Sequence, residues 1–420
     1  MSKLRIRYFG PINEGLSSNG GWIEIRKVTV LTGNQGTGKS TIAKLISTFT
    51  WIEKSLVRGD YSKNWFEHKD RFQKQVLSYH RLENYFQLHG EKRTEIEFLG
   101  DAYHIHFLNG FLKIKETETK KYSLPQILYI PAERNFISHV RTPKELKMVS
   151  ESLREFVIEF DQAKKSLKEA LILPINNTRI EYDQLNDIVN LGGENYKLKL
   201  SDSSSGFQSL VPLYLVTHIL ARNIQSRNQE NPESMSAEEI QRFQKGVQEI
   251  WENSDLTDEQ KRVALSVLSS KFNKTSFVNI VEEPEQNLYP DSQWLVLQKL
   301  LANNNLNEGN QLILSTHSPY IINYLSIAVQ GNVVKNKISS NSQISENQKT
   351  KLYQKLYDII PNESLIASEE LAIYQLSDNG GSIELLETYE GIPSDQNYLN
   401  KSLIHGNTLF DKLLELEDSL

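Results

Sequence analysis

The sequence predicts an α/β fold, in which short buried strands alternate with helices. Four uncharged, mainly apolar segments have the length of a buried strand: 28–31, 126–130, 277–281 and 311–315. The first of them leads into a glycine-rich turn, after which the composition becomes typical of a helix. A chain of 420 residues has room for two or three domains, or for one large domain with insertions. We therefore expect a sizeable core built around a sheet.

The N-terminal half is predicted to combine strands with one long helical stretch. Residues 4–9 and 22–32 are apolar or alternating and are separated by glycines, so they predict strands. From residue 40 to about residue 88 the composition is helical. An antiparallel meander is expected next, because Gly100-Asp101 and Asn109-Gly110 turns separate short alternating segments. Its strands would span 94–98, 103–107 and 111–114.

The chain after the meander is predicted to contain more polar, exposed segments. Residues 143–172 predict one or two amphipathic helices, and the charged segment 226–260 predicts an exposed helical insertion. The segment 331–350 is rich in Ser, Asn and Lys and predicts a loop. A hairpin over 372–387 is expected to turn at Asn379-Gly380-Gly381.

The charge is distributed unevenly along the chain. The 47 Lys and Arg against 53 Asp and Glu give a net charge of -6, which argues against a polybasic protein that binds nucleic acid with its whole surface. Residues 361–420, however, hold 12 acids and two lysines, so the first 360 residues carry +4 (45 minus 41). Local basic patches therefore remain possible, and the acidic end is a candidate surface for a basic partner protein.

The absence of cysteine excludes several chemistries at once. Disulfides, thiolate zinc sites, iron–sulfur clusters and cysteine nucleophiles are all ruled out. Residues 1–15 begin with basic residues but have no apolar run of signal-peptide length. The longest apolar run, 210–220, is far short of the roughly 20 residues that cross a bilayer. A soluble, cytoplasmic protein without a membrane partner is expected.

A phosphate-binding loop is predicted after the strand at 28–31. The sequence of residues 33–40, GNQGTGKS, fits the pattern of such loops and stands between a predicted strand and a predicted helix, as the pattern requires. The glycines let backbone N–H groups point into one concavity, and the helix N-terminus adds positive potential for a triphosphate. Lys39 would reach the β and γ phosphates, and Ser40 would hold Mg²⁺. The nucleotide-binding residues expected here are Asn34, Gln35, Gly36, Thr37, Gly38, Lys39, Ser40 and Thr41.

An acidic pair closes the predicted strand 277–281. Glu282 would belong to the magnesium shell, and Glu283 would orient or deprotonate the attacking water as the catalytic carboxylate. The common form of this motif has Asp where Glu282 stands. The metal contact of Glu282 therefore needs the longer side chain or a bridging water.

The functional interpretation of two further motifs is supported by their position in the chain relative to the phosphate loop and the acidic pair. His317 follows the strand 311–315; a single His there is more often structural, but behind a phosphate loop and an acidic strand it is expected to sense the γ-phosphate. Ser205, Gly206 and Gln208 precede an apolar helix, so their hydroxyl and N–H groups form either a second anion site or a plain helix cap.

Together these four motifs resemble those of ABC-type ATPase heads, in which Ser205, Gly206 and Gln208 would be the signature. The resemblance covers most of the chain and implies a P-loop NTPase fold with a mixed sheet core, an antiparallel β subdomain and a helical subdomain. It implies ATP and Mg²⁺ as cofactors. It also implies a head-to-tail dimer or higher homo-oligomer, because in this family the signature of one copy closes over the nucleotide of the other. Residues 286–289 would be the D-loop at that seam.

On this basis the chain divides into four parts. An ATPase lobe is expected at 1–221 and a polar helical insertion at 222–275. The second part of the ATPase core would span 276–330, and an acidic C-terminal region completing the core would span 331–420.

Two other residue pairs remain open. Glu133 and Arg134 end a predicted core strand and either contact the nucleotide or transmit its state, or else form a structural ion pair. His104 and His106 share one face of a strand and could chelate zinc, but a solvated strand face is favoured because no third ligand is evident nearby.

A closer resemblance is to the stand-alone ATPases of bacterial anti-phage defence. The stretches TGNQGTGKSTIAKLIS, YIPAERNFIS, SDSSSGFQSLVPLY and VEEPEQNLYP look like those of the PARIS system ATPase, and are similar to the Septu ATPase and to the ATPase half of the overcoming-lysogenisation-defect proteins. This resemblance implies an oligomeric sensor that holds a separate toxic nuclease and frees it when a phage protein is detected.

The residues bear on one part of that implication. Only 103 residues follow His317 (420 minus 317), and neither an Asp-x-Asp nor a His/Asn/His cluster occurs, so no nuclease activity of its own is expected and an effector nuclease would act in trans. A transporter head is set aside, because 78 residues separate Ser205 from Glu283 (283 minus 205), far more than in that class. Repair ATPases of the Rad50 and RecF kind, with DNA as the partner, remain the alternative.

Overall fold

The protein has a mixed α/β fold, which confirms the predicted class. The computed structural model describes residues 1–87, 92–118, 122–140, 150–225, 237–254, 256–257, 260–261, 264, 268, 275–377 and 381–418. Parts of three predicted segments lie outside these residues: 143–149, 226–236 and the turn residues Asn379 and Gly380.

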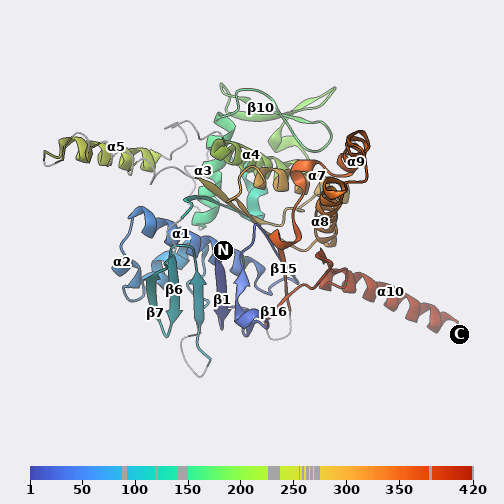
Figure 1. Cartoon of the computed structure of the whole chain (residues 1–420), viewed down its shortest axis with the longest axis horizontal. Coiled ribbons are helices and arrows are strands. Elements are labelled where there is room, and N and C mark those ends of the chain that lie inside the picture. Colours follow the sequence, from blue (N-terminus) through green and yellow to red (C-terminus); the bar gives the residue numbers. More distant parts are fainter. Residues whose placement is uncertain are drawn as a thin grey trace.

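A seven-stranded mixed sheet forms the centre of the molecule (Figure 1), in the order β2-β16-β15-β4-β14-β13-β8. The five strands from β15 to β8 are mutually parallel, and β16 is antiparallel to β15. Every residue of β4 and β13 is buried, which is why these strands read as continuous apolar runs. The strands are β2 (Gly15–Leu16), β4 (Val28–Gly33), β8 (Pro125–Ile130), β13 (Ser276–Glu282), β14 (Gln311–Thr316), β15 (Leu371–Leu376) and β16 (Ser382–Leu385).

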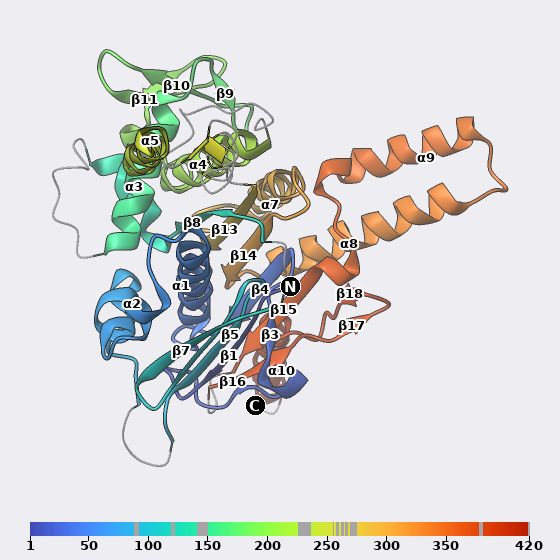
Figure 2. The same cartoon turned by 60° about the vertical axis from the view of Figure 1, so that its left-hand side comes forward.

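A five-stranded antiparallel sheet in the order β3-β1-β5-β6-β7 contains the predicted meander. Helix α1 (Lys39–Arg58) packs between this sheet and the central sheet (Figure 2). Phe49 of α1 stacks on Phe98 of β5, and Ile313 of β14 joins the same core from the other side. The strands are β1 (Lys3–Arg7), β3 (Ile23–Glu24), β5 (Glu95–Leu99), β6 (Tyr103–Leu108) and β7 (Phe111–Glu116).

The opposite face of the central sheet is covered by helices. Leu312 and Leu314, which alternate with Ile313 along β14, point into this second core. The helices are α3 (Glu151–Lys165), α4 (Ser205–Gln225), α7 (Pro290–Asn304) and α8 (Pro319–Ser340). A small antiparallel sheet that the sequence analysis did not predict joins this side; its strands are β9 (Leu171–Ile172), β10 (Arg179–Asp183), β11 (Ile188–Gly192) and β12 (Lys197–Lys199).

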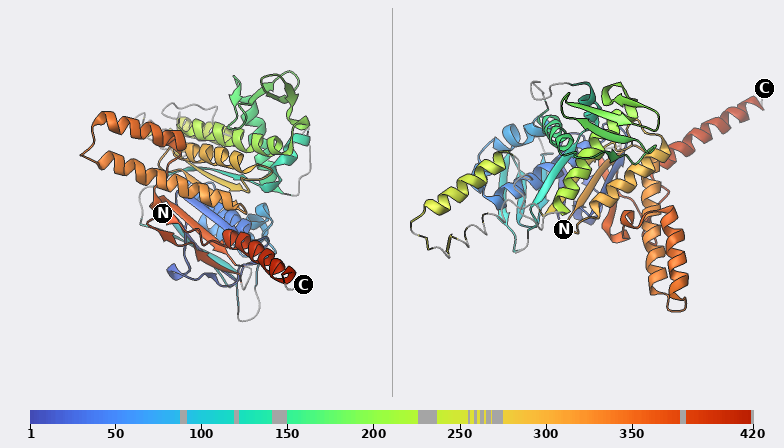
Figure 3. Two further views of the ribbon diagram at one scale, coloured as in Figure 1. Left: turned by 90° about the vertical axis from the view of Figure 1, so that its right-hand side faces the viewer. Right: turned by 90° about the horizontal axis from the view of Figure 1, so that it is seen from above.

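The prediction of a loop at 331–350 is wrong. Helix α8 runs to Ser340, and α9 (Glu346–Ile359) begins after a short turn, with a capping box made by Ser345 and Gln348. The two helices form a hairpin that projects from the body (Figures 2 and 3). Ser, Asn and Lys are frequent here because most of the hairpin faces solvent, and polar composition by itself does not separate an exposed helix from a loop.

Helices α5 (Ala237–Glu252) and α10 (Tyr398–Glu417) lie at opposite ends of the molecule (Figure 1). Helix α5 confirms the helical character of the described part of the predicted insertion. Two short strands, β17 (Thr388–Tyr389) and β18 (Ile392–Pro393), precede α10. Among the described residues, no helix combines the length and apolar character needed to cross a membrane.

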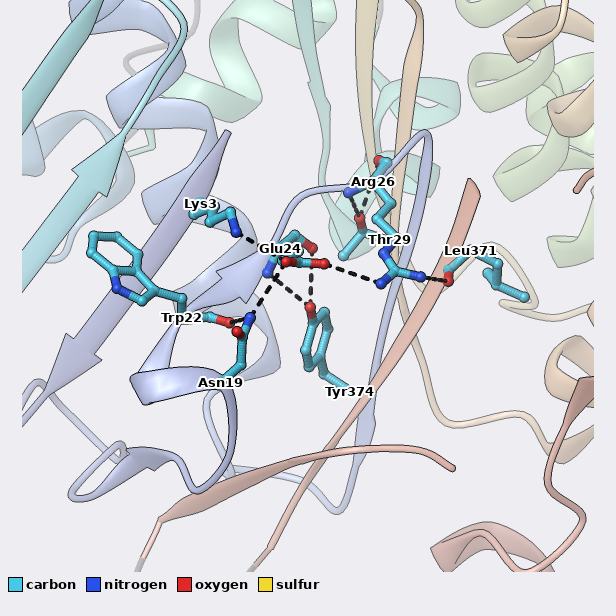
Figure 4. Close-up of polar contacts among 8 residues, drawn as sticks. All are labelled: Lys3, Asn19, Trp22, Glu24, Arg26, Thr29, Leu371 and Tyr374. Atoms are coloured by element: carbon cyan, nitrogen blue, oxygen red, sulfur yellow. Dashed lines mark hydrogen bonds and ion pairs between the residues drawn. The ribbon is translucent and has the colours of Figure 1, made fainter. Parts of the chain in front are cut away.

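Glu24 connects the antiparallel sheet to the central sheet (Figure 4). Its carboxylate accepts hydrogen bonds from Lys3 and Arg26, each at 3.0 Å. These bonds hold the pKa of Glu24 below its ordinary value, and the bond from Lys3 has the larger effect. Its backbone N–H donates to the hydroxyl of Tyr374 at 2.8 Å, and Arg26 donates to the carbonyl of Leu371 at 3.0 Å. Strand β15 is therefore fixed to the N-terminal strands.

Glu53 of α1 is expected to make stability depend on pH. It is 3% exposed, and burial raises its pKa from 4.5 to about 7, although Oε1 accepts the N–H groups of Ala102 and Tyr103 at 2.7 and 3.0 Å. A raised carboxyl pKa favours the folded state fully below pH 4.5, and this contribution is lost as the pH rises through 7. Unfolding in urea should show a loss of about 3 kcal/mol between these limits.

Glu53→Gln should abolish this pH dependence, because an amide oxygen can still accept both N–H groups and carries no charge. Glu346→Gln, at an exposed position of α9, is the matched control and should behave as wild type. If the free energy of unfolding falls equally in Glu53→Gln and wild type between pH 4.5 and 7, Glu53 is not the cause of the pH dependence.

Candidate functional site

The phosphate loop has the predicted strand–loop–helix geometry, between β4 and α1. Gly38 requires glycine, because its φ is 105° and a Cβ there would lie 2.9 Å from the side chain of Ile12. Lys39 donates from Nζ to the carbonyls of Gly33 and Asn34, at 2.9 and 2.7 Å. The loop is thus closed around its own lysine.

A cavity of about 350 Å³ brings the predicted motifs together. The phosphate loop contributes Gln35, Gly36, Gly38, Lys39, Ser40 and Thr41 to its lining. The acidic pair and the histidine, Glu282, Glu283 and His317, line the same cavity. The sequence analysis missed four other lining residues: Pro11, Tyr85, Ala132 and Ser315. Ser315 could have been found, since it ends the strand before His317, whereas Pro11 and Tyr85 carry no motif.

Two predicted loop residues do not line this cavity. Asn34 lies with His317 in an adjoining cavity of about 450 Å³, next to Leu376 and Tyr398. The hydroxyl of Thr37 donates to the carbonyl of Asn34 at 2.9 Å and so stabilises the loop from within.

Glu282 has the environment of a metal ligand. The residue is 6% exposed, and Oε2 accepts the N–H of Ala132 at 3.3 Å, while Oε1 is buried with no hydrogen-bond partner among the described residues. A buried carboxylate oxygen without a partner is costly unless a cation or donor satisfies it. Ser40 lines the same cavity. An oxygen-only donor pair of this kind fits Mg²⁺.

Glu283 lies at the end of β13 in an unusual backbone conformation. Its φ is 46°, in the left-handed region that non-glycine residues rarely adopt and that is enriched at functional sites. Its N–H donates to the carbonyl of Ser315 at 2.8 Å, and its carboxylate lies 3.6 Å from Nε2 of His317. Burial and then the charge of Lys39 lower the pKa of His317, which favours a neutral imidazole facing the carboxylate of Glu283.

Glu285 is a site residue that the sequence analysis missed. It accepts the hydroxyl of Thr316 at 2.8 Å and the N–H of His317 at 2.7 Å. Burial raises the pKa of Glu285. It therefore positions the histidine that follows β14. The third carboxylate of the segment VEEPEQ was the available signal.

Arg134 is buried behind the acidic pair, in the helical segment η4 (Ala132–His139). It is 1% exposed and donates to the carbonyls of Glu282 and Glu283, both at 2.6 Å, and of Ser209 at 3.1 Å. Burial lowers its pKa to about 10, so it stays charged at neutral pH. Arg134 does not line the nucleotide cavity. Its bonds link the backbone of the acidic pair to α4, and Glu133 is exposed at the surface.

The signature residues do not meet the other motifs within one chain. Ser205 is exposed at the first turn of α4, and a Cβ on Gly206 would lie 2.9 Å from the carbonyl of Asn287 in the predicted D-loop. Gln208 is buried and donates to the carbonyls of Ser201 and Ser203, both at 3.0 Å, so its amide caps the preceding loop. A contact of Ser205 with nucleotide would have to come from a second copy.

The histidines of β6 take part in an ion-paired strand face. His104 bonds Glu97 at 2.7 Å, and His106 bonds Glu95 at 3.2 Å. Glu95, Glu97 and His106 have ligand atoms within 4.8 Å of one another, but Arg5 pairs with both carboxylates. A guanidinium inside the cluster already neutralises the charge that a zinc ion would need, so the ion-paired surface is the better description.

Comparisons with known proteins place the chain among nucleotide-binding folds. A family model described as "AAA domain, putative AbiEii toxin, Type IV TA system" matches residues 28–323. No curated protein matches.

Solved structures similar to the chain include two SMC heads and one ATP-binding cassette, all of low sequence identity. One is an SMC head bound to the C-terminal winged-helix domain of ScpA, with 10% identity, a TM-score of 0.35 and coverage of 91% of this chain and 96% of that chain. The SMC head domain from Thermotoga maritima has 10% identity, a TM-score of 0.33 and coverage of 92% and 98%. The ADP- and Pi-bound dimer of the ATP-binding cassette MJ0796 has 12% identity, a TM-score of 0.28 and coverage of 77% and 91%.

Proposed function

Because the chain belongs to the AAA_21 family of AAA domains, we propose that it is the ATP-hydrolysing sensor and scaffold of an anti-phage defence system. In this role it holds a separate toxic nuclease and frees it when a phage protein is detected. Its fold is that of a P-loop ATPase head. The family description refers to a toxin of a type IV toxin–antitoxin system, which supports a defence role for this chain.

ATP hydrolysis follows from the groups that line the nucleotide cavity. Lys39 and the loop N–H groups bind the phosphates. Ser40 and Glu282 would hold Mg²⁺, which would supply positive charge next to the phosphates. Glu283 accepts a proton from the attacking water. His317 lines the same cavity beside Glu283, where it contacts the γ-phosphate. The observation that carries this part is the common cavity of Lys39, Glu283 and His317.

Turnover in this proposal requires two copies, because Ser205 is exposed and outside the cavity of its own chain. Ser205→Arg should block hydrolysis, since a long cationic side chain prevents α4 from closing over the nucleotide of the partner copy. ATP binding to a single head should stay unchanged. Steady-state hydrolysis and equilibrium ATP binding measure the two effects. Ser201→Arg, exposed before α4, is the control; unchanged turnover in Ser205→Arg would remove the signature role.

Helix α10 supports the scaffold part of the proposal. None of its 20 residues is buried, although it carries a set of large apolar side chains, each at least 45% exposed. These are Leu403, Ile404, Leu409, Phe410, Leu413, Leu414 and Leu416. Exposed apolar surface of this kind marks protein interaction sites. The segment 361–420, which ends with this helix, holds 12 acids and two lysines, so a basic effector protein is the expected partner.

Co-purification with the product of the adjacent gene tests the scaffold role. The double variant Leu403→Asp/Phe410→Asp should lose the effector and keep wild-type ATP hydrolysis, because neither residue lines the nucleotide cavity or the adjoining cavity. The control Lys349→Asp alters exposed α9 instead. Retention of the effector by the α10 variant would exclude this helix as the contact, and absence of any effector would remove the scaffold role.

A DNA-binding ATPase of the Rad50 and RecF kind is the second candidate, and the α8–α9 hairpin favours it. Residues 319–359 contain five lysines and two acids, a balance of +3 on a projecting arm. Affinity for duplex DNA should then fall steeply with salt, and lysine-to-glutamate changes at Lys335, Lys337 and Lys351 should flatten that slope. Fluorescence anisotropy at several salt concentrations measures this. Salt-independent or absent binding would leave the scaffold proposal alone.

A further inference from the structure

A second cavity, of about 250 Å³, lies between α1, β8, α3 and the helical segments η2 (Phe72–Val76) and η3 (Leu77–His80). It shares no lining residue with the nucleotide cavity. Five of its lining residues are aromatic: Trp51, Tyr61, Trp65, Tyr79 and Tyr129. Tyr61 and Trp65 lie 4.3 Å apart between ring centroids, and Trp51 lies 5.8 Å from Tyr61, so part of the wall is one aromatic cluster.

The polar groups of this cavity are acidic or neutral. Glu151 and Glu155, both exposed on α3, are the charged residues of its described lining, and Glu155 accepts the hydroxyl of Tyr79. His80 is 2% exposed, yet neither ring nitrogen has a hydrogen-bond partner among the described residues. Its ring packs against Tyr79 and Tyr129, at 4.7 and 4.8 Å between centroids.

His80 is uncharged at neutral pH. Burial, followed by the charge of Lys44, lowers its pKa to about 3. Lys44 is on α1 but does not line the cavity. A neutral imidazole has one acceptor and one donor nitrogen, and leaving both unused in a buried site is costly.

We propose that this cavity binds a small organic cation, of the amine, amidinium or guanidinium class. Aromatic faces attract such cations, carboxylates at the rim offset the charge, and the acceptor nitrogen of His80 can take an N–H from the ligand. The same carboxylates disfavour phosphates and other anions. A volume of about 250 Å³ admits a ligand of one ring or a short chain. This site does not depend on the proposed defence role.

The cavity is also adjacent to the magnesium side of the nucleotide site. Tyr129 lines it from β8, and after burial the charge of Glu282 is the next cause of the raised pKa of Tyr129. Three residues beyond Tyr129, the N–H of Ala132 donates to Glu282. Tyr129 therefore lies between this cavity and Glu282, which lines the nucleotide cavity.

Calorimetric titration of the full chain with benzamidine tests the proposal, with benzamide as an uncharged ligand of the same shape. Benzamidine should bind saturably and at least tenfold more tightly than benzamide. The double variant Glu151→Gln/Glu155→Gln should weaken benzamidine about tenfold and leave benzamide unchanged. Since both residues are exposed, the variant should fold, and its thermal unfolding checks this.

Two further variants complete the test. Glu346→Gln/Glu363→Gln removes two exposed carboxylates elsewhere and should bind benzamidine as wild type does. Trp51→Leu, at a ring that is 37% exposed, should weaken benzamidine several-fold through loss of the cation–π contact. Absence of benzamidine binding, equal affinity for the two ligands, or wild-type affinity in the Glu151→Gln/Glu155→Gln variant would overturn the proposal.

Discussion

Glu283→Gln is expected to lower ATP turnover by about 10²- to 10⁴-fold while leaving ATP binding unchanged, the usual range for loss of a general base. The amide can still occupy the position 3.6 Å from His317, but it cannot accept a proton from water. ATP-bound dimers should therefore accumulate. Steady-state hydrolysis gives the first effect, and light scattering in the presence of ATP gives the second.

Two further variants serve as the comparison for Glu283→Gln: one that should lose nucleotide binding and one that should keep normal hydrolysis. Lys39→Ala should abolish nucleotide binding altogether, because Lys39 is the lysine of the phosphate loop and is held by its carbonyls. Glu363→Gln, an exposed carboxylate outside the cavity, should hydrolyse ATP normally. Normal hydrolysis by Glu283→Gln would remove its assignment as the catalytic carboxylate.

Arg134→Gln is expected to reduce both stability and turnover. The shorter side chain cannot reach all four carbonyls that Arg134 bonds, so the buried carbonyls of Glu282, Glu283 and Ser209 lose this donor. Loss of such a buried charged donor costs about 3 to 5 kcal/mol in the free energy of unfolding, measured in urea. Turnover should fall more than ATP binding, because the acidic pair loses its connection to α4.

Arg222→Gln, at an exposed position of α4, is the matched control for this change. Arg134→Lys retains the charge and should give an intermediate loss of stability, which keeps the test informative if Arg134→Gln does not fold. If Arg134→Gln is as stable and as active as Arg222→Gln, the bonds of Arg134 to these carbonyls contribute nothing to stability or turnover.

The parts of the site that are local in sequence were predictable. The phosphate loop needs glycines, a lysine and a serine at fixed spacing between a strand and a helix, so the motif alone identifies its residues. Buried parallel strands such as β13 and β14 are equally visible as uncharged apolar runs.

The parts that depend on distant neighbours were not predictable. Arg134 is buried only because α4 and the end of β13 meet above it, and its partners are backbone carbonyls, which leave no mark in the sequence. Glu285 and Gln208 likewise bond backbone groups of other segments. The strands β9 to β12 are at most five residues long and only partly buried, too short for a clear period. The α8–α9 hairpin was mistaken for a loop because its surface is polar.

Strand β15 has a consequence for synthesis of the protein. It pairs with β4, and its last residue, Leu376, is in register with Gly33 at the start of the phosphate loop. These two residues are 343 positions apart (376 minus 33), which a ribosome covers in roughly 20 to 70 s. Until then β4 is the open edge of an incomplete sheet. A nascent or truncated chain ending before residue 371 thus lacks the strand that pairs with β4 beside the phosphate loop.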